Sequence, residues 1–112
     1  MIKTNPLLLD EAVGFLFLKG DKMSIEKLRQ EIDNLDKKLI ELLNERARVS
    51  QQILQEKQRL KLPIYNHQRE QQVLQQVMQQ NKGPLTSEQV KSIFQRIIES
   101  CRAIQQKQKG SE

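Results

Sequence analysis

One helical stretch places two cations on a face where apolar residues are expected. Residues 44–60 read NERARVSQQILQEKQRL, and Arg46 takes the place of a leucine in the apolar stripe. Lys57 lies 11 residues further on, a net rotation of about 20° along a helix. Their Cα atoms are expected about 16.5 Å apart, so two long side chains that lean together leave a gap of small-molecule size.

Polar residues also interrupt the apolar faces of the next two helical stretches. Asn66 and Glu70 lead into the apolar face of the second stretch at helical spacing. On the third stretch, Gln105 follows the buried-side residue Cys101 by four positions. Because an isolated buried charge is costly, we expect these groups to line one polar pocket inside a helical bundle. The predicted pocket consists of Arg46, Lys57, Asn66, Glu70 and Gln105.

Each of these residues taken alone also has an ordinary structural interpretation. Arg46 is compatible with a side chain that snorkels at the edge of a seam, and Lys57 with a cation that favours a helix C-terminus. Asn66 has the residue type of an N-cap, and Cys101 that of a small core residue. These interpretations do not explain why three helices all place polar groups on faces that should be buried.

The chemistry of the predicted pocket indicates an anionic ligand that also carries a hydroxyl group. The sequence contains no His and Cys set with metal-ligand spacing, no glycine-rich phosphate loop and no nucleophile beside a base. His67, the single histidine, falls in an exposed first helical turn and is assigned no catalytic role. We therefore expect no metal and no cofactor, and a site that works by positioning and electrostatics.

A long first helix is predicted to carry Arg46 and Lys57. No Gly or Pro occurs between Ile25 and Leu60, and apolar residues recur there at steps of three and four. This stripe consists of Leu28, Ile32, Leu35, Leu39, Leu42, Val49 and Ile53. Such a helix is about 52 Å long, whereas a 100-residue domain has a radius of gyration of about 13 Å. We therefore expect a homodimer that buries the stripe.

Two shorter helices are predicted to complete an all-α, three-helix chain. Pro63 ends the first helix, and a second is expected over residues 66–80. Thr86 and Gln89 have the spacing of a capping box. The third helix that they begin is expected to reach about Lys107.

Composition favours a single helical domain and argues against several other classes. The chain has 112 residues, 4% aromatic residues and one cysteine, which favours a small aliphatic core and the cytoplasm. The net charge of +5 comes from 19 basic residues interleaved with 14 acidic ones. This distribution resembles a solvated surface, and the basic excess is also compatible with a small anionic ligand, so charge alone does not decide the partner. Nucleic acid is not the expected partner.

The first 22 residues are predicted to be an extension of unknown role. Their apolar run AVGFLFL follows Asp10 and Glu11 and lacks a signal-peptide cleavage site. It is also far shorter than the ~20 residues that span a bilayer, so no membrane interaction is expected. Met23, followed by the candidate N-cap Ser24, is a candidate translation start. The expected division is 1–22 extension, 23–109 helical domain and 110–112 tail.

Several motifs together resemble the all-helical AroQ class of chorismate mutases. They are LRQEIDNLDKKLIELLNERARVSQQILQEK, LPIYNHQREQQVL and IFQRIIESCRAIQQ, and the resemblance covers residues 24–108. It implies an intertwined homodimer of three-helix chains that converts chorismate to prephenate, as in phenylalanine and tyrosine biosynthesis.

The resemblance also implies roles for individual residues. Lys57 and Gln105 would donate to the substrate's ether oxygen, and Lys57 would also contact a carboxylate. Arg46 would hold a substrate carboxylate. Arg29 would reach across the dimer to hold a carboxylate in the partner's site.

Four further positions are implied to line the substrate-binding site. Arg69 would support carboxylate binding, while Glu70 and the backbone at Asn66 would bind the ring hydroxyl. Asn66 stands where the family commonly has Asp, and Cys101 where it often has Ser. We expect these two differences to alter affinity rather than to abolish activity.

Three other functions have less support in the sequence. Isochorismate pyruvate lyase has the same fold but resembles the sequence less around REQQVL. A non-enzymatic module that binds a partner, such as another enzyme of the pathway, would not need the pocket residues together. A nucleic-acid binder would need a one-sided basic stripe with aromatic residues.

Overall fold

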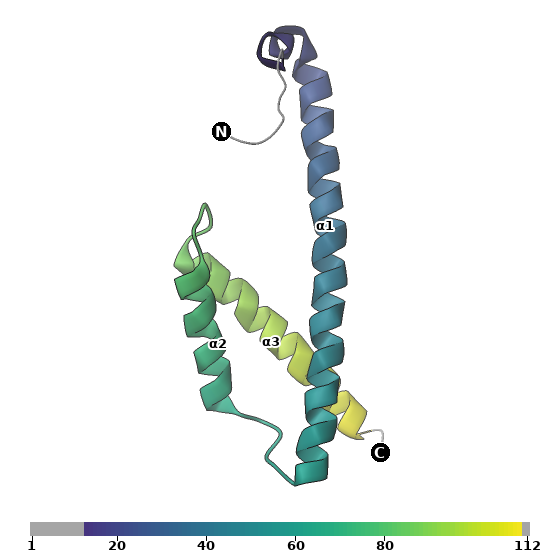
Figure 1. Cartoon of the computed structure of the whole chain (residues 1–112), viewed down its shortest axis with the longest axis vertical. Coiled ribbons are helices and arrows are strands. Elements are labelled where there is room, and N and C mark those ends of the chain that lie inside the picture. Colours follow the sequence, from purple (N-terminus) through teal and green to yellow (C-terminus); the bar gives the residue numbers. More distant parts are fainter. Residues whose placement is uncertain (1–12, 111–112) are drawn as a thin grey trace. The chain divides into compact units, whose positions relative to one another are not determined.

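In the computed structural model, residues 13–110 form three helices, α1 over Val13–Leu60, α2 over His67–Gln80 and α3 over Ser87–Gly110 (Figure 1). The structure describes the backbone of residues 13–110 and the side chains of residues 24–107. Within residues 13–110 there is no β-strand, so the expected all-α, three-helix chain is confirmed. The chain divides into two units, residues 1–40 and 41–112, and α1 contributes to both.

α1 begins earlier than the sequence predicted. The expected start was Ile25 with Ser24 as N-cap, but the helix begins at Val13 and Ser24 lies inside it. Residues 13–24 contain no proline, and their two glycines, Gly14 and Gly20, each cost only about 1 kcal/mol relative to alanine. The predicted helix start is therefore wrong, because no residue in this segment is a strong helix breaker.

The proposed extension and tail are only partly covered by the structure. Residues 1–12 and 111–112 lie outside the described residues. The division of the chain into 1–22, 23–109 and 110–112 therefore stays a prediction. No helix in the described part of the chain combines the length and apolar character needed to cross a bilayer.

α1 ends in a Schellman motif that positions the loop to α2. Lys61 has a φ of 59°, and its N–H donates to the carbonyl of Gln58 at 3.2 Å. The N–H of Leu62 donates to the carbonyl of Lys57 at 2.8 Å. These two bonds satisfy carbonyls that a helix end otherwise leaves unpaired. Pro63 disfavours further helix at the residue before it.

We expect Lys61→Gly to raise the free energy of unfolding by about 1 kcal/mol, because a side chain with a Cβ is strained at positive φ. Lys61→Ala is the control, since it removes the charge but keeps the Cβ. Urea unfolding at a fixed protein concentration measures both variants. A glycine variant no more stable than the alanine variant would contradict a strained Lys61.

Side-chain caps begin α2 and α3. The Oδ1 of Asn66 accepts from the backbone N–H of Arg69 at 3.0 Å, so the interpretation of Asn66 as an N-cap is confirmed. The N–H of Thr86 donates to Oε1 of Gln89 at 3.0 Å, and the N–H of Gln89 donates to Oγ1 of Thr86 at 3.1 Å. This reciprocal pair is the predicted capping box. α3 continues to Gly110, three residues beyond the expected end.

The small core of the 41–112 unit lies between the C-terminal part of α1 and the pair α2 and α3. α2 and α3 pack against each other (Figure 1). Leu54 on α1 is fully buried at 0% exposure, whereas its neighbour Ile53 is 48% exposed. The other buried residues are Leu74, Ile98 and Cys101. The fully buried residue of α1 is therefore not a member of the predicted stripe.

The predicted apolar stripe of α1 is exposed in the single chain. In the 1–40 unit, its exposed members are Leu28, Ile32, Leu35 and Leu39. In the 41–112 unit, they are Leu42, Val49 and Ile53. Large exposed apolar surfaces of this kind are typical of protein interfaces.

Candidate active site

A cavity of about 290 Å³ lies within the 41–112 unit and is lined by all three helices and the loop between α1 and α2. The five residues of the predicted pocket all line it. Three polar or charged residues join them, namely Ser50, Arg69 and Arg102. The apolar wall consists of Val49, Ile53, Ile64, Val73 and Ile98. The size is at the lower end of the range for small-molecule sites.

Arg46 enters the cavity from α1 and is held by α3. Its Nη1 donates to Sγ of Cys101 at 3.2 Å. Cys101 is buried with 7% exposure, as expected of a small core residue. A thiol is a weak acceptor, so this contact orients the guanidinium and leaves most of its hydrogen-bonding capacity for a ligand.

Lys57 and Gln105 are each held by a backbone carbonyl. Nζ of Lys57 donates to the carbonyl of Ile64 at 2.7 Å. Nε2 of Gln105 donates to the carbonyl of Ser50 at 2.7 Å. An ammonium has three N–H groups and a carboxamide has two, so each side chain keeps at least one more donor. Because a carbonyl only accepts hydrogen bonds, the Ser50 carbonyl requires the NH2 end of the Gln105 amide to face α1.

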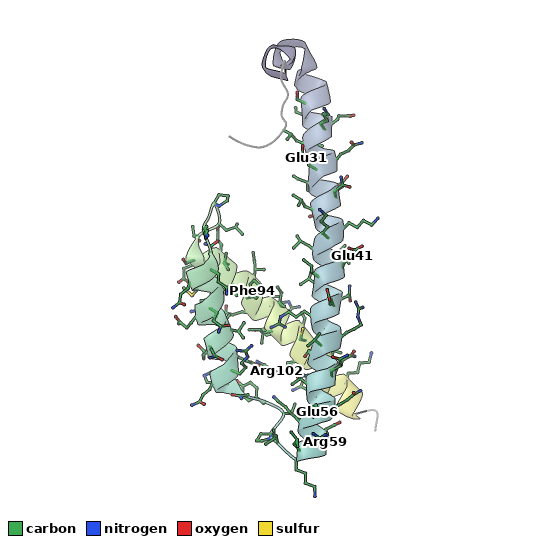
Figure 2. All side chains as sticks on the ribbon, viewed as in Figure 1. Glu31, Glu41, Glu56, Arg59, Phe94 and Arg102 are labelled. Carbon is green, nitrogen blue, oxygen red and sulfur yellow. The ribbon has the colours of Figure 1, made fainter. Side chains whose placement is uncertain are left out.

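Glu70 of α2 is paired with Arg102 of α3, a residue that the sequence reasoning missed. Nε of Arg102 donates to Oε2 of Glu70 at 3.1 Å, and its second amino group donates to Oε1. Figure 2 labels Arg102, which lies between the two helices. The hydrogen bonds with Glu70 raise the pKa of Arg102 above its ordinary value, so the guanidinium stays charged. Arg102 lies three residues before Gln105, and residues three apart on a helix are neighbours on its surface. This spacing was the signal in the sequence that Arg102 lies near the pocket.

Asn66 and Arg69 form the more exposed rim of the cavity at the start of α2. Besides the N-cap bond, Nη1 of Arg69 donates to Oε1 of Gln72 at 2.7 Å. Both residues are exposed in the single chain. Arg69 is therefore free to change its rotamer when a ligand binds, at the cost of one exposed hydrogen bond.

We expect Asn66→Ala to lower the free energy of unfolding by about 1 kcal/mol, because it removes an N-cap. Asn66→Asp should be neutral within a few tenths of a kcal/mol, since aspartate caps about as well. Thermal or urea unfolding at equal protein concentration measures both. Equal losses for Ala and Asp would mean that the amide has another structural role.

Arg29 is the one predicted site residue that does not line the cavity. It lies on α1 in the 1–40 unit and is exposed. Its predicted role in the partner's site is not tested by a single chain and stays a prediction.

The cavity is strongly positive. Arg46, Lys57, Arg69 and Arg102 face one carboxylate, Glu70, which leaves an excess of three positive charges. Such a surplus favours a ligand with two or more negative charges. Among the described residues, no group of three or more His, Cys, Asp or Glu side chains is arranged to hold a metal ion.

The fold and the cavity define an all-helical protein with a positively charged cavity of small-molecule size. The chain belongs to the chorismate mutase type II family, whose model matches residues 28–106. The resemblance noted in the sequence is therefore confirmed.

Individual relatives agree with this assignment. The bifunctional chorismate mutase/prephenate dehydratase of Pseudomonas aeruginosa is 42% identical over 92 residues, covering 78% of this chain and 25% of that protein. The protein of the same name from Stutzerimonas stutzeri is 36% identical, covering 73% and 24%. The chain thus spans about a quarter of the length of these curated relatives. The solved chorismate mutase (form II) of Thermus thermophilus aligns with a TM-score of 0.74 and 30% identity, covering 76% of this chain and 97% of that one.

Proposed function

We propose that the chain is a chorismate mutase, an isomerase that converts chorismate to prephenate by a Claisen-type rearrangement. The observation that carries the proposal is the pair of donors Lys57 and Gln105 in a cavity with an excess of positive charge. Membership of the chorismate mutase type II family supports it independently. The reaction breaks one ether C–O bond and forms one C–C bond within a single molecule, so no cofactor or metal is needed.

The proposed catalysis combines folding of the substrate with stabilisation of charge. Chorismate is a flexible dianion that reacts from a chair-like conformation, and Arg46 and Arg69 would hold its carboxylates in that conformation. As the C–O bond breaks, negative charge grows on the ether oxygen. Lys57 and Gln105 would then bind the transition state more strongly than the substrate. The carbonyls of Ile64 and Ser50 already fix both donors, which reduces reorganisation during the reaction.

Glu70 and Asn66 would bind the ring hydroxyl. A carboxylate only accepts, so Glu70 suits a hydroxyl donor. Cys101 lies against Arg46 and would set the position of that guanidinium. Asn66 stands where the family commonly has Asp, and its neutral amide still caps α2. We therefore expect a change in affinity for the substrate rather than a loss of activity.

The proposed active form is a homodimer in which Arg29 completes the partner's site. The exposed stripe of α1 supports the dimer, because Leu28, Ile32 and Leu35 are each more than half exposed in one chain. A two-fold axis that pairs two α1 helices in antiparallel fashion would bring Arg29 of one chain near Arg46 of the other. The cavity's surplus of positive charge would then increase further, as a dianion requires.

The same reaction suggests a partner enzyme in the pathway to phenylalanine and tyrosine. The relatives carry prephenate dehydratase in the same polypeptide, so an enzyme that consumes prephenate is the proposed partner. We place this step in the cytoplasm and propose neither a nucleic-acid nor a membrane partner.

Parallel incubations with chorismate and isochorismate test the proposed reaction against its nearest rival. We expect chorismate to give prephenate, identified by NMR, and isochorismate to give no pyruvate above the uncatalysed rate. Pyruvate released from isochorismate faster than prephenate forms from chorismate would assign the chain to the lyase reaction instead.

A further inference from the structure

The Arg102–Glu70 pair differs from the other ion pairs among the described residues. Arg59–Glu56 and Arg96–Glu99 each join neighbours three residues apart on one exposed helix surface. Arg102 and Glu70 are 32 residues apart and connect α3 to α2. Their side chains are 32% and 20% exposed, and both line the cavity. This pair therefore lies within the site rather than on the outer surface.

The Arg102 guanidinium is fixed from a second direction by an aromatic ring. Its Cζ lies 4.8 Å from the centroid of the Tyr65 ring, a distance typical of a cation–π contact. Tyr65 lies in the loop between α1 and α2, and its hydroxyl is 3.1 Å from Nδ1 of His67. Arg102 is thus held between a carboxylate and a ring, with little freedom to point elsewhere.

The two bonds from Arg102 constrain the direction of the Glu70 carboxylate. A planar guanidinium that donates to both carboxylate oxygens defines the orientation of the carboxylate plane. A carboxylate has about four lone-pair sites, so two accepted bonds leave further acceptor sites for a ligand. Arg102 itself has no acceptor, and two of its N–H groups donate to Glu70. Arg102 is therefore suited to orient Glu70, and it cannot itself accept a hydrogen bond from a ligand.

We infer that Arg102, braced by Tyr65, is a positioning residue that holds Glu70 as an oriented acceptor for the substrate's hydroxyl group. The inference rests on the proposed function, in which Glu70 binds the ring hydroxyl. Other charged groups line the same cavity, namely Arg46 and Lys57 on α1 and Arg69 on α2. Among the described residues, however, only Arg102 forms an ion pair with Glu70.

The inferred role predicts a specific kinetic signature. The ring hydroxyl is present in both the substrate and the transition state, so loss of its acceptor should weaken the binding of both equally. Such a change raises KM and leaves kcat nearly unchanged. We expect Arg102→Leu to raise the KM for chorismate about ten-fold, the effect of disturbing one hydrogen bond to a charged group.

A double-mutant cycle tests whether Arg102 acts through Glu70. We expect Glu70→Gln to raise KM by about as much as Arg102→Leu, and the double variant to be no worse than about two-fold beyond either single variant. Arg102→Lys should restore part of the loss, because lysine supplies the charge without the two-pronged geometry. Arg96→Leu is the matched control, since it removes an arginine of the same helix that is paired with Glu99 away from the cavity.

Tyr65 variants keep the inference testable if Arg102→Leu fails to fold. Tyr65 is 54% exposed, so its replacement should be tolerated. We expect Tyr65→Leu to raise KM about three-fold through loss of the cation–π contact. Tyr65→Phe keeps the ring and its contact with Arg102, so it should raise KM by less than Tyr65→Leu. The Tyr65→Leu effect should vanish in the Glu70→Gln background.

Two outcomes would overturn the inference and leave the proposed function standing. In the first, Arg102→Leu folds, converts chorismate and has a KM within two-fold of wild type. In the second, the increase in KM of the double variant equals the product of the increases caused by Arg102→Leu and Glu70→Gln alone. That result would mean that Arg102 contacts the ligand independently of Glu70. Absence of any chorismate conversion by the wild type would instead reject the proposed function itself.

Discussion

Lys57→Ala is expected to lower kcat for chorismate conversion by about 10²-fold or more, the usual cost of removing a donor to developing negative charge. The Lys57 ammonium is held by the carbonyl of Ile64 at 2.7 Å, so it is already oriented before the transition state forms. The carbonyl left behind belongs to Ile64, which is partly exposed in the loop between α1 and α2, and we expect unchanged helix content by circular dichroism. Steady-state kinetics with chorismate measures the effect.

Lys82→Ala provides the matched control for Lys57→Ala. Lys82 is an exposed lysine in the connector between α2 and α3, and it does not line the cavity. Its replacement removes the same charge and should leave kcat unchanged within about two-fold, as for most surface substitutions. If Lys57→Ala retained activity within a few-fold of wild type, the assignment of Lys57 to the ether oxygen would be wrong.

Arg29→Ala and Arg46→Ala proteins are each expected to be nearly inactive alone but to regain activity when unfolded together and refolded. In a mixed dimer, one site receives an intact Arg46 from the first variant and an intact Arg29 from the second. The other site loses both. Random reassembly makes about half of the dimers mixed, each with one good site of two, so about a quarter of wild-type activity should return.

A second mixture controls for nonspecific recovery. Arg46→Ala and Lys57→Ala both alter the cavity of the same chain, so no mixed dimer contains a complete site and no activity should return. Size-exclusion chromatography checks that every mixture has reassembled. Restored dimers of Arg29→Ala with Arg46→Ala that stay inactive would show that Arg29 acts within its own chain or only in folding.

Local features of the fold were predictable from the sequence because their causes are local. The capping box of Thr86 and Gln89 and the N-cap Asn66 depend on residues three positions apart. The end of α1 near Pro63 follows from the restriction that proline imposes on its predecessor. The start of α1 was placed wrongly because Ser24 has the residue type of an N-cap. Whether the helix begins at Ser24 or earlier depends on the residues before it, which continue the helix back to Val13.

The pocket residues were predictable because each interrupts a helical periodicity. Arg46, Lys57 and Gln105 occupy positions on faces that should be apolar, and this pattern is visible without knowing how the helices pack. All three line the cavity. The pattern does not identify their hydrogen-bond partners, because the carbonyls of Ile64 and Ser50 have no signature in the sequence.

Residues whose environment depends on packing were missed. Leu54 is the fully buried residue of α1, but it lies beside the stripe that periodicity selects. α1 has apolar residues on more than one side, and only the packing of α2 and α3 decides which of them are buried within the chain. Arg102 resembles an ordinary surface arginine until α2 brings Glu70 next to it.

We expect this chain to accelerate the rearrangement of chorismate through the cavity that contains Lys57. The most direct test follows chorismate absorbance with purified protein in the presence of a metal chelator and identifies the product by NMR. We predict a rate proportional to the concentration of wild-type protein, with prephenate as the product. A rate no higher than that of the uncatalysed reaction at any protein concentration would contradict the claim.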